Sequence, residues 1–258
     1  MLKKAIILSL VLLNLLTNPI FASGPGYKTI VYVVAAGISN YQCINSLNLP
    51  RQDAIAIARL FKSHNAKVKL LTDQNATKEK LLQTLQSVFT KAKKEDIILF
   101  FFSGHGIQNG FCTYDTNCQY GKYITYDDLK KIYKQSKAER KIIFADACFS
   151  GAIRTESKQK ISKESLINQH LLLFLSSRTD ETSMERTSMR NGYFTTFLLD
   201  GLKGKADKNK DRIITAQELF DYVSPGVSRL SDDRQHPVMW GKFSDNLILM
   251  DNRKTKNE

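Results

Sequence analysis

The chain has 258 residues, of which 42% are hydrophobic and 24% charged, and its formal net charge is +13. This composition excludes a collagen-like repeat and a disordered chain, and the length is sufficient for one α/β domain with a well-buried core. The lysines are scattered rather than gathered into a stripe with aromatic residues, so we expect a solvated lysine-rich surface and no nucleic-acid partner.

The first 23 residues have the pattern of a secretory signal peptide. A positively charged start is followed by an almost wholly apolar run over 5–16 and by small residues at Ala22 and Ser23. The apolar run is shorter than the about 20 residues that a membrane span needs, and no later segment meets that requirement. We therefore expect residues 1–23 to be removed and 24–258 to form one secreted or periplasmic domain without a membrane span.

Strands and helices alternate along the rest of the chain. The expected strands are 27–36, 66–71, 97–102, 141–145 and 171–175, and the expected helical stretches are 54–61, 81–89, 125–128 onward, 194–202 and 216–227. Two apolar segments near the carboxyl terminus, 238–240 and 247–249, are expected to close the core. This alternation predicts an α/β fold with a mostly parallel central sheet and helices on both faces. The polar stretch 154–169 is expected to be an exposed loop.

Two of the buried strands run into residues that can do chemistry. The strand 97–102 leads into the tetrapeptide SGHG, which contains His105, and the strand 141–145 leads into DACFSG, which contains Cys148. Because open α/β sheets place their chemistry at the carboxyl ends of the strands, we expect His105 and Cys148 to meet at one sheet edge. A thiol beside an imidazole is the basis of a cysteine nucleophile with its base.

These two motifs resemble the two signatures of caspase-like cysteine peptidases, in particular those of the bacterial metacaspase-like members. The resemblance continues in 37–41, 53–54, 71–77, 176–185 and 191–195, and so extends over nearly all of the chain after the signal peptide.

The resemblance implies a caspase-like fold and hydrolysis of peptide bonds through a thioester. Cys148 would be the nucleophile and His105 the general base and acid, with no cofactor required. Backbone amides near Gly106 and Cys148 are expected to hold the developing oxyanion.

Two carboxylates match the acidic pocket with which metacaspases accept arginine or lysine before the cleaved bond. Asp146 lies two residues before the nucleophile, and Asp53 lies on the first predicted helix. Pro50 stands where metacaspases often have cysteine, so the pocket wall differs. A carboxylate pair suits a guanidinium or ammonium group, so the expected partners are proteins or peptides with basic residues. A purely structural role is the alternative for Asp146. Ser176 falls where the family lines its substrate groove.

The cysteines other than Cys148 have separate interpretations. Cys112 and Cys118 bracket a turn-forming loop, and in an oxidising compartment this spacing favours a disulfide. A metal pair is the alternative, but no nearby Cys or His completes a set of ligands. Cys43 is expected to be a small filler in the loop after the first strand. Cys148 is then left unpaired, as a nucleophile must be.

The segment 207–218 is a candidate calcium site. It places oxygen ligands at the spacing of an EF-hand loop, from Asp207, Asn209, Asp211 and Glu218. The sixth position, where glycine is usual because the backbone turns sharply, is Arg212. A polar loop that leads into a helix is the alternative interpretation.

The main interpretation is therefore a secreted cysteine endopeptidase that cuts after Arg or Lys. The alternative is a catalytically silent binding protein of the same fold, whose hallmark, loss of the histidine or cysteine, is not seen. Self-cleavage is expected in 154–169, because caspases separate their two subunits there and this segment offers basic residues. Nothing in the sequence distinguishes a monomer from a dimer.

Overall fold

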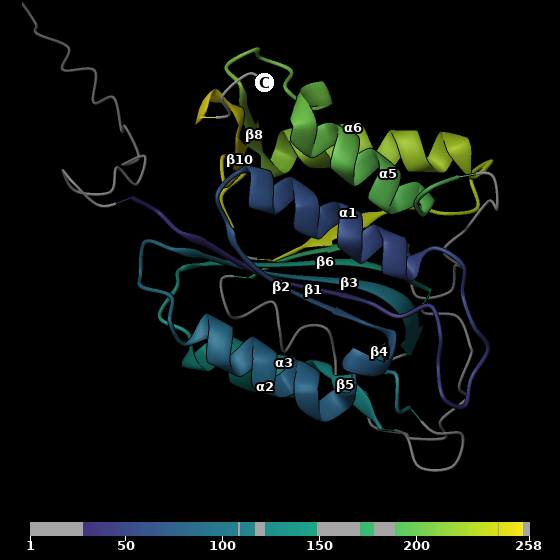
Figure 1. The fold of residues 1–258 in the computed structure, drawn as a ribbon. Helices are drawn as coiled ribbons and strands as arrows, with labels where there is room; N and C mark the ends of the chain where they lie inside the picture. The colour runs from purple at the N-terminus through teal and green to yellow at the C-terminus, as the bar shows by residue number, and fades with distance from the viewer. Residues whose placement is uncertain are drawn as a thin grey trace, which may run out of the picture.

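The structure is a computed structural model that describes residues 28–107, 109–116, 122–148, 171–177, 189–241 and 243–254. A central sheet lies between two layers of helices (Figure 1). Across the sheet the strands are β2 (Lys67–Thr72), β1 (Val31–Gly37), β3 (Ile97–Ile107), β6 (Arg140–Cys148), β7 (Leu171–Leu175) and β9 (Val238–Trp240). The first five strands pair in parallel, and β9 pairs antiparallel with β7. The predicted α/β fold with a mostly parallel sheet is confirmed.

Helices cover both faces of this sheet. One face carries α1 (Pro50–Ser63), α5 (Tyr193–Asp200) and α6 (Ala216–Leu230), and the other carries α2 (Lys78–Phe89) and α3 (Tyr126–Gln135). Each face has its own cluster of buried apolar residues, because successive side chains of a strand point to opposite sides. On β1, for example, Val33 packs towards α1 and Val34 towards α2.

Short elements complete the fold. They are β4 (Gly110–Cys112), β5 (Tyr123–Thr125), β8 (Ile213–Thr215), β10 (Ile248–Asp251), the 3₁₀ turns Asp73–Asn75 and Asn252–Lys254, and the π-helical turn Gly201–Lys205. Strands β4 and β5 extend the end of β3 as an antiparallel ladder, while β8 and β10 form a separate pair. The predicted tail segments thus correspond to β9 and β10.

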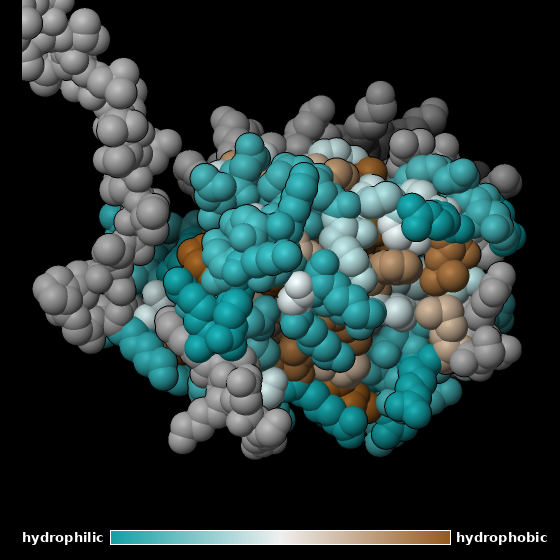
Figure 2. All heavy atoms as spheres, turned by 90° about the horizontal axis from the view of Figure 1, so that it is seen from above, coloured by the Kyte–Doolittle hydropathy of each residue, from teal (hydrophilic) through white to brown (hydrophobic). Residues whose placement is uncertain are grey.

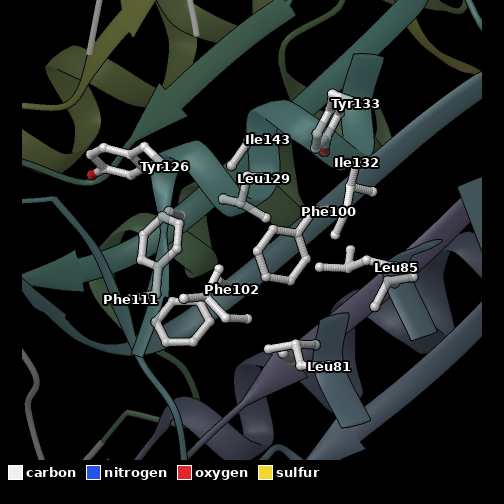
Figure 3. Packing of buried hydrophobic residues seen from close by; sticks show 14 of the residues in the cluster. Leu81, Leu85, Phe100, Phe102, Phe111, Tyr126, Leu129, Ile132, Tyr133 and Ile143 are labelled. Carbon is white, nitrogen blue, oxygen red and sulfur yellow. The ribbon is translucent and has the colours of Figure 1, made fainter. Parts of the chain in front are cut away.

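Aromatic packing fixes the strand that leads to the predicted histidine. Phe100 and Phe102 of β3 lie in a buried cluster with Phe111 of β4 and Tyr126 of α3 (Figure 3). The rings of Phe102 and Phe111 stack with centroids 4.6 Å apart, and Tyr126 meets Phe111 edge-on at 5.7 Å. Interlocked rings of this size bury much apolar area in defined orientations, so the end of β3 is held firmly.

The surface over α1, α5 and α6 is mostly hydrophilic, with smaller apolar groups between the polar residues (Figure 2). Among the described residues, Leu70 is the exposed large hydrophobic side chain. No helix in the described part of the chain is long and apolar enough to cross a membrane. The predicted signal peptide, 1–23, and the predicted loop, 154–169, lie outside the described residues.

Candidate active site

The sheet brings the two predicted catalytic residues together. Strands β3 and β6 pair in parallel, and their register sets His105 opposite Cys148. Neighbouring strands lie about 4.8 Å apart, so these residues are adjacent across the ladder. Both belong to the strands themselves, whereas the sequence predicted positions just past the strand ends. The side chain of Cys148 is not among those that the structure describes.

The loop that follows β1 holds His105 in place. The backbone N–H of His105 donates to the hydroxyl of Tyr41 over 2.7 Å, and the two rings lie 5.0 Å apart. The His105 Nε2 atom lies 2.8 Å from the backbone carbonyl oxygen of Asn45. Since a carbonyl oxygen can only accept, we assign the proton to Nε2. In the neutral ring Nδ1 then carries the lone pair, which is the state required of a general base.

Gly104 is required beside His105. Its φ of +154° lies in a region that side chains with a Cβ rarely adopt, and a Cβ there would lie 2.4 Å from the Tyr41 hydroxyl oxygen. A larger residue would therefore displace the tyrosine that holds the His105 backbone.

The two predicted pocket carboxylates also lie together. Asp53 of α1 and Asp146 of β6 are both buried, with 1% and 6% of their surface exposed. A methyl group built on Gly192 would lie 2.6 Å from Asp146 Oδ2 and 3.4 Å from Asp53 Oδ2. Both carboxylates therefore approach the Gly192 backbone closely and leave no room for a side chain there, although they come from different elements.

Neutral donors orient Asp53. Its Oδ1 accepts hydrogen bonds from the Asn191 side chain at 2.8 Å and from the Gly192 backbone at 3.0 Å. Its Oδ2 accepts from the Ser103 hydroxyl at 2.8 Å. Burial, and next the charge of Asp146, raise the pKa of Asp53 from 3.8 to about 8, although these donors lower it.

Asp146 is held from the start of α5. Its Oδ2 accepts from the backbone N–H of Thr195 at 3.1 Å and from the Thr195 hydroxyl at 2.8 Å. Asp146 therefore has structural hydrogen bonds and still lies next to a second carboxylate. The two interpretations of this residue are compatible.

Sequence reasoning missed Ser103, Tyr41, Asn191 and Thr195 as members of the site. Ser103 stands in the SGHG motif, and Asn191 and Thr195 stand in a segment that shares the family resemblance. The sequence therefore marked the segments of these residues but did not indicate that their side chains bind the two aspartates. Tyr41 likewise belongs to a resembling segment. A role for each required knowledge of which distant segment it contacts.

Ser176 and Gly106 lie close to the dyad. The backbone N–H of Ala147 donates to the Ser176 hydroxyl at 3.1 Å, so this buried side chain braces the strand just before Cys148. Gly106 follows His105 and pairs with Phe111 of β4. The predicted roles of Ser176 in the substrate groove and of Gly106 in the oxyanion region stay predictions.

The remaining cysteines differ in exposure. Cys43 is exposed, so its predicted role as a small filler is wrong. Cys112 is a buried free thiol in this structure, and burial raises its pKa to about 12. Its predicted disulfide partner, Cys118, lies outside the described residues, and the bridge stays a prediction.

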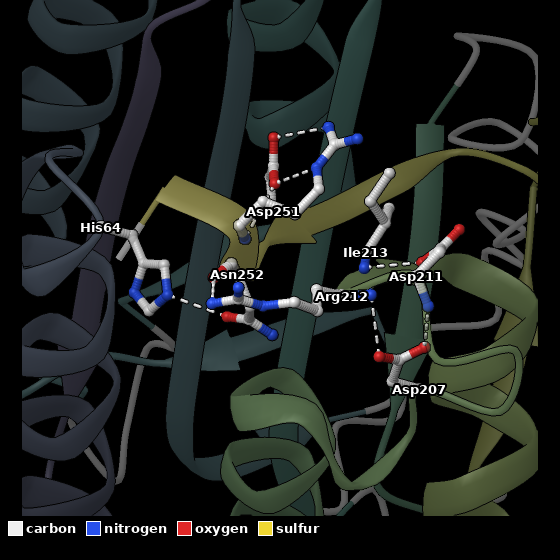
Figure 4. Close-up of polar contacts among 8 residues, drawn as sticks. His64, Asp207, Asp211, Arg212, Ile213, Asp251 and Asn252 are labelled. Carbon is white, nitrogen blue, oxygen red and sulfur yellow. Dashed lines mark hydrogen bonds and ion pairs between the residues drawn. The ribbon is translucent and has the colours of Figure 1, made fainter. Parts of the chain in front are cut away.

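The carboxylates of the predicted calcium loop are engaged by the loop itself (Figure 4). Asp207 accepts from the backbone N–H of Asp211 at 3.1 Å and of Arg212 at 2.9 Å, and Asp211 accepts from that of Ile213 at 2.7 Å. Arg212 has a φ of 65°, the sharp turn for which glycine is usual.

Glu218, the last predicted calcium ligand, caps α6 by accepting from the Thr215 backbone and hydroxyl. The described residues contain no cluster of three or more His, Cys, Asp or Glu side chains placed to hold a metal ion. Calcium binding by Asp207, Asn209, Asp211 and Glu218 stays a prediction.

Comparison with known proteins agrees with this geometry. A family model described as "Caspase domain" matches residues 31–248. Caspase-1 from Spodoptera frugiperda superposes with a TM-score of 0.65 and 14% sequence identity, over 90% of this chain and 93% of that one. Protein GSU0716 from Geobacter sulfurreducens gives 0.62 and 17%, over 83% and 94%. Among curated proteins no match is found. The predicted caspase-like fold is confirmed.

Proposed function

The chain belongs to the caspase-domain family, and from this premise we propose that it is a cysteine endopeptidase with Cys148 as nucleophile and His105 as base. The observation that carries the proposal is the register of β3 and β6, which sets these two residues opposite each other. The contact of His105 Nε2 with the Asn45 carbonyl supports it, because it leaves Nδ1 as the basic nitrogen.

The reaction follows from the chemistry of the two side chains. His105 takes the thiol proton, and the Cys148 sulfur attacks the carbonyl carbon of the scissile bond. Backbone amides beside Gly106 and Cys148 stabilise the oxyanion. His105 then returns the proton to the leaving amine, which gives a thioester on Cys148. Water, deprotonated by His105, hydrolyses the thioester and restores the thiol.

The substrate is a protein or peptide with Arg or Lys before the cleaved bond. The support is the buried pair of Asp53 and Asp146, whose carboxyl groups lie together beside Gly192. A cationic side chain that reaches carboxylates in a buried setting gains a strong interaction, whereas an aspartate side chain is repelled. The amino-terminal pattern supports export, and so a secreted or periplasmic location.

A peptide-cleavage assay tests the proposal. Peptides that differ only in having Arg, Lys or Asp before the scissile bond are incubated with the wild type, Cys148→Ala, His105→Ala and the exposed-cysteine control Cys43→Ala. We expect cleavage of the Arg and Lys peptides by the wild type and the control, and a loss of about 10³-fold or more in both dyad variants.

Circular dichroism would establish that the dyad variants are folded. Undiminished cleavage by Cys148→Ala would end the peptidase proposal, and efficient cleavage after Asp would end the acidic-pocket specificity. A folded wild type that cleaves no peptide in a broad library would favour the catalytically silent binding protein.

A further inference from the structure

The loop that follows β1, residues 38–49, begins between two neighbouring strand ends. In the sheet β1 lies between β2 and β3, and the register sets its last residue, Gly37, opposite Thr72 on one side and Ser103 on the other. His105 lies two positions beyond Ser103, and Asp73 lies one position beyond Thr72. The loop therefore has the catalytic base on one side and the carboxylate of Asp73 on the other.

The carboxylate of Asp73 binds the start of this loop. Its Oδ1 accepts the backbone N–H groups of Ser39 at 2.9 Å and of Asn40 at 3.0 Å. Its Oδ2 lies 3.7 Å from the Nε atom of Arg51, whose side chain is 55% exposed. Hydrogen bonds to a carboxylate are stronger than those to a neutral acceptor, whereas an exposed ion pair contributes little. The two bonds to the backbone amides are therefore the contacts that hold the loop.

The turn that begins at Asp73 supports the same loop by a second route. The backbone N–H of Gln42 donates to the carbonyl of Tyr114 at 3.0 Å, and the N–H of Tyr114 donates to the carbonyl of Ala76 at 3.0 Å. The N–H of Ala76 in turn donates to the backbone carbonyl of Asp73 at 2.7 Å. The residues after β2 thus hold the loop at two places, of which the Asp73 carboxylate is the one that a substitution removes.

The amides bound by Asp73 directly precede the residues that hold His105. Tyr41 is the next residue after Asn40, and its hydroxyl accepts the backbone N–H of His105. Four residues further on, the carbonyl of Asn45 lies at the Nε2 atom of His105. The position of both groups depends on the path of the backbone from Ser39 onward, and the Asp73 carboxylate fixes the beginning of that path.

We propose that Asp73 is a positioning residue for His105: its carboxylate holds the loop 38–49 in the conformation in which Tyr41 and Asn45 orient the imidazole. The inference rests on the proposed function, in which His105 is the general base. Asp73 acts through the loop and not on the ring itself. Without the carboxylate, two backbone N–H groups lose their acceptor, so the loop departs from this conformation and His105 loses its supports.

Steady-state hydrolysis of an Arg peptide by Asp73→Ala and Asp73→Asn provides the first test. We expect the kcat of Asp73→Ala to fall about ten- to hundredfold with KM within about twofold, because the base is displaced while the acidic pair on α1 and β6 stays in place. In Asp73→Asn the amide oxygen still accepts both N–H groups. This conservative variant should therefore retain the wild-type kcat within about threefold.

Two further variants separate the carboxylate from its surroundings. Asp73 has a φ of 46°, which glycine adopts without strain, so Asp73→Gly removes the carboxylate at no backbone cost. It should lose kcat as Asp73→Ala does, and it replaces that variant if alanine prevents folding. Arg51→Gln removes the ion pair but keeps the two bonds to the loop, so it should have the wild-type kcat.

Residue-resolved amide hydrogen exchange, measured by NMR, gives a readout that needs no activity. The His105 N–H, which Tyr41 accepts, should exchange about tenfold or more faster in Asp73→Ala and Asp73→Gly than in the wild type. The N–H of Phe100, earlier on the same strand, should exchange at the wild-type rate within about twofold. A carboxylate that served only to stabilise its own turn would leave the exchange at His105 unchanged.

The outcomes separate this proposal from the proposed function. A wild-type kcat in Asp73→Ala, or a loss in Asp73→Ala that Asp73→Gly does not share, overturns the positioning role. Unaltered exchange at His105 in a folded Asp73→Gly also overturns it, whatever the kcat. A wild type that cleaves no peptide ends the peptidase proposal, and the exchange at His105 then decides by itself whether Asp73 positions this residue.

Discussion

The imidazole of His105 is positioned by groups that are distant in the sequence. Tyr41 accepts its backbone N–H and packs against its ring, and the Asn45 carbonyl lies at Nε2. Both contacts come from the loop after β1, some sixty residues before the histidine. The reactivity of His105 therefore depends on a loop that supplies no catalytic side chain.

Replacing Tyr41 with phenylalanine tests this dependence. The Tyr41→Phe variant keeps the ring but leaves the His105 N–H without its acceptor, a loss of about 1–3 kcal/mol for a buried donor. We expect kcat to fall about tenfold or more with KM within about twofold, because the ring is tilted from its working position while the pocket is unchanged. The measurement is steady-state hydrolysis of an Arg peptide.

Tyr123→Phe is the matched control, since Tyr123 lies on β5 and pairs with Cys112 of β4. It should keep the kcat of the wild type. An unaltered kcat in Tyr41→Phe would contradict the positioning role of the hydroxyl.

For single residues, the sequence predicts the functional side chains better than the groups that hold those side chains in place. His105, Cys148, Asp53 and Asp146 stand in motifs, so their residue types carried the information. The Asn45 carbonyl belongs to the backbone, and since every residue has such a carbonyl, the residue type at position 45 does not reveal the contact. The Asn191 contact to Asp53 joins residues 138 positions apart, which no local pattern encodes.

Among the elements, long periodic segments were predictable, whereas several short ones were not. The five parallel strands and the helices α1, α2, α3, α5 and α6 lie close to their expected ranges. Strand β3, however, runs on to Ile107 through two glycines of low strand propensity, because β6 and β4 pair with that stretch. Strands β4, β5 and β8 have three residues each, too few for a period to show.

The loop 207–212, before β8, is stabilised by carboxylates of its own residues. Asp207 accepts two backbone N–H groups where Lys210 and Arg212 have positive φ angles, 63° and 65°. Arg212 also exchanges hydrogen bonds with Asn252, whose side chain contacts His64 at the end of α1 (Figure 4). The loop is thereby linked, through Asn252 of the 3₁₀ turn that follows β10, to the end of α1.

We expect Asp207→Ala to lower the melting temperature by about 2–6 °C, since about 1–2 kcal/mol of hydrogen bonding to a strained turn is lost. Differential scanning calorimetry measures this against Asp245→Ala, an exposed carboxylate that should change the melting temperature little. An Asp207→Ala protein as stable as the wild type would contradict the role of this carboxylate.

The same scans with and without calcium test the predicted ion site. A rise in wild-type melting temperature that needs calcium and is absent from Asp207→Ala would support it.

The whole molecule is built so that the sheet assembles the site from separate parts of the chain. The dyad comes from β3 and β6, and the acidic pair comes from α1 and β6, with donors from β3 and the start of α5. Strands β6 and β7, which flank residues 149–170 in the sequence, pair in parallel side by side in the sheet.

This topology bears on the predicted self-cleavage in 154–169, which offers Arg154, Lys158, Lys160 and Lys163 to the acidic pocket. A cut there would leave β6 and β7 paired over five register positions, from Lys141–Leu171 to Ala145–Leu175. The two pieces would also share the buried cluster beneath α1, α5 and α6. We therefore expect them to remain one particle after cleavage, because separation would expose that core to water.

Incubation of the purified protein, followed by amino-terminal sequencing, tests the cut itself. New amino termini should follow basic residues of 154–163 in the wild type and be absent from Cys148→Ala. Size-exclusion chromatography should show both pieces eluting at the position of the intact protein, while denaturing electrophoresis separates them. A single uncut species in a preparation that hydrolyses peptides would contradict self-cleavage. Pieces that separate under native conditions would instead contradict the account of a core shared across β6 and β7.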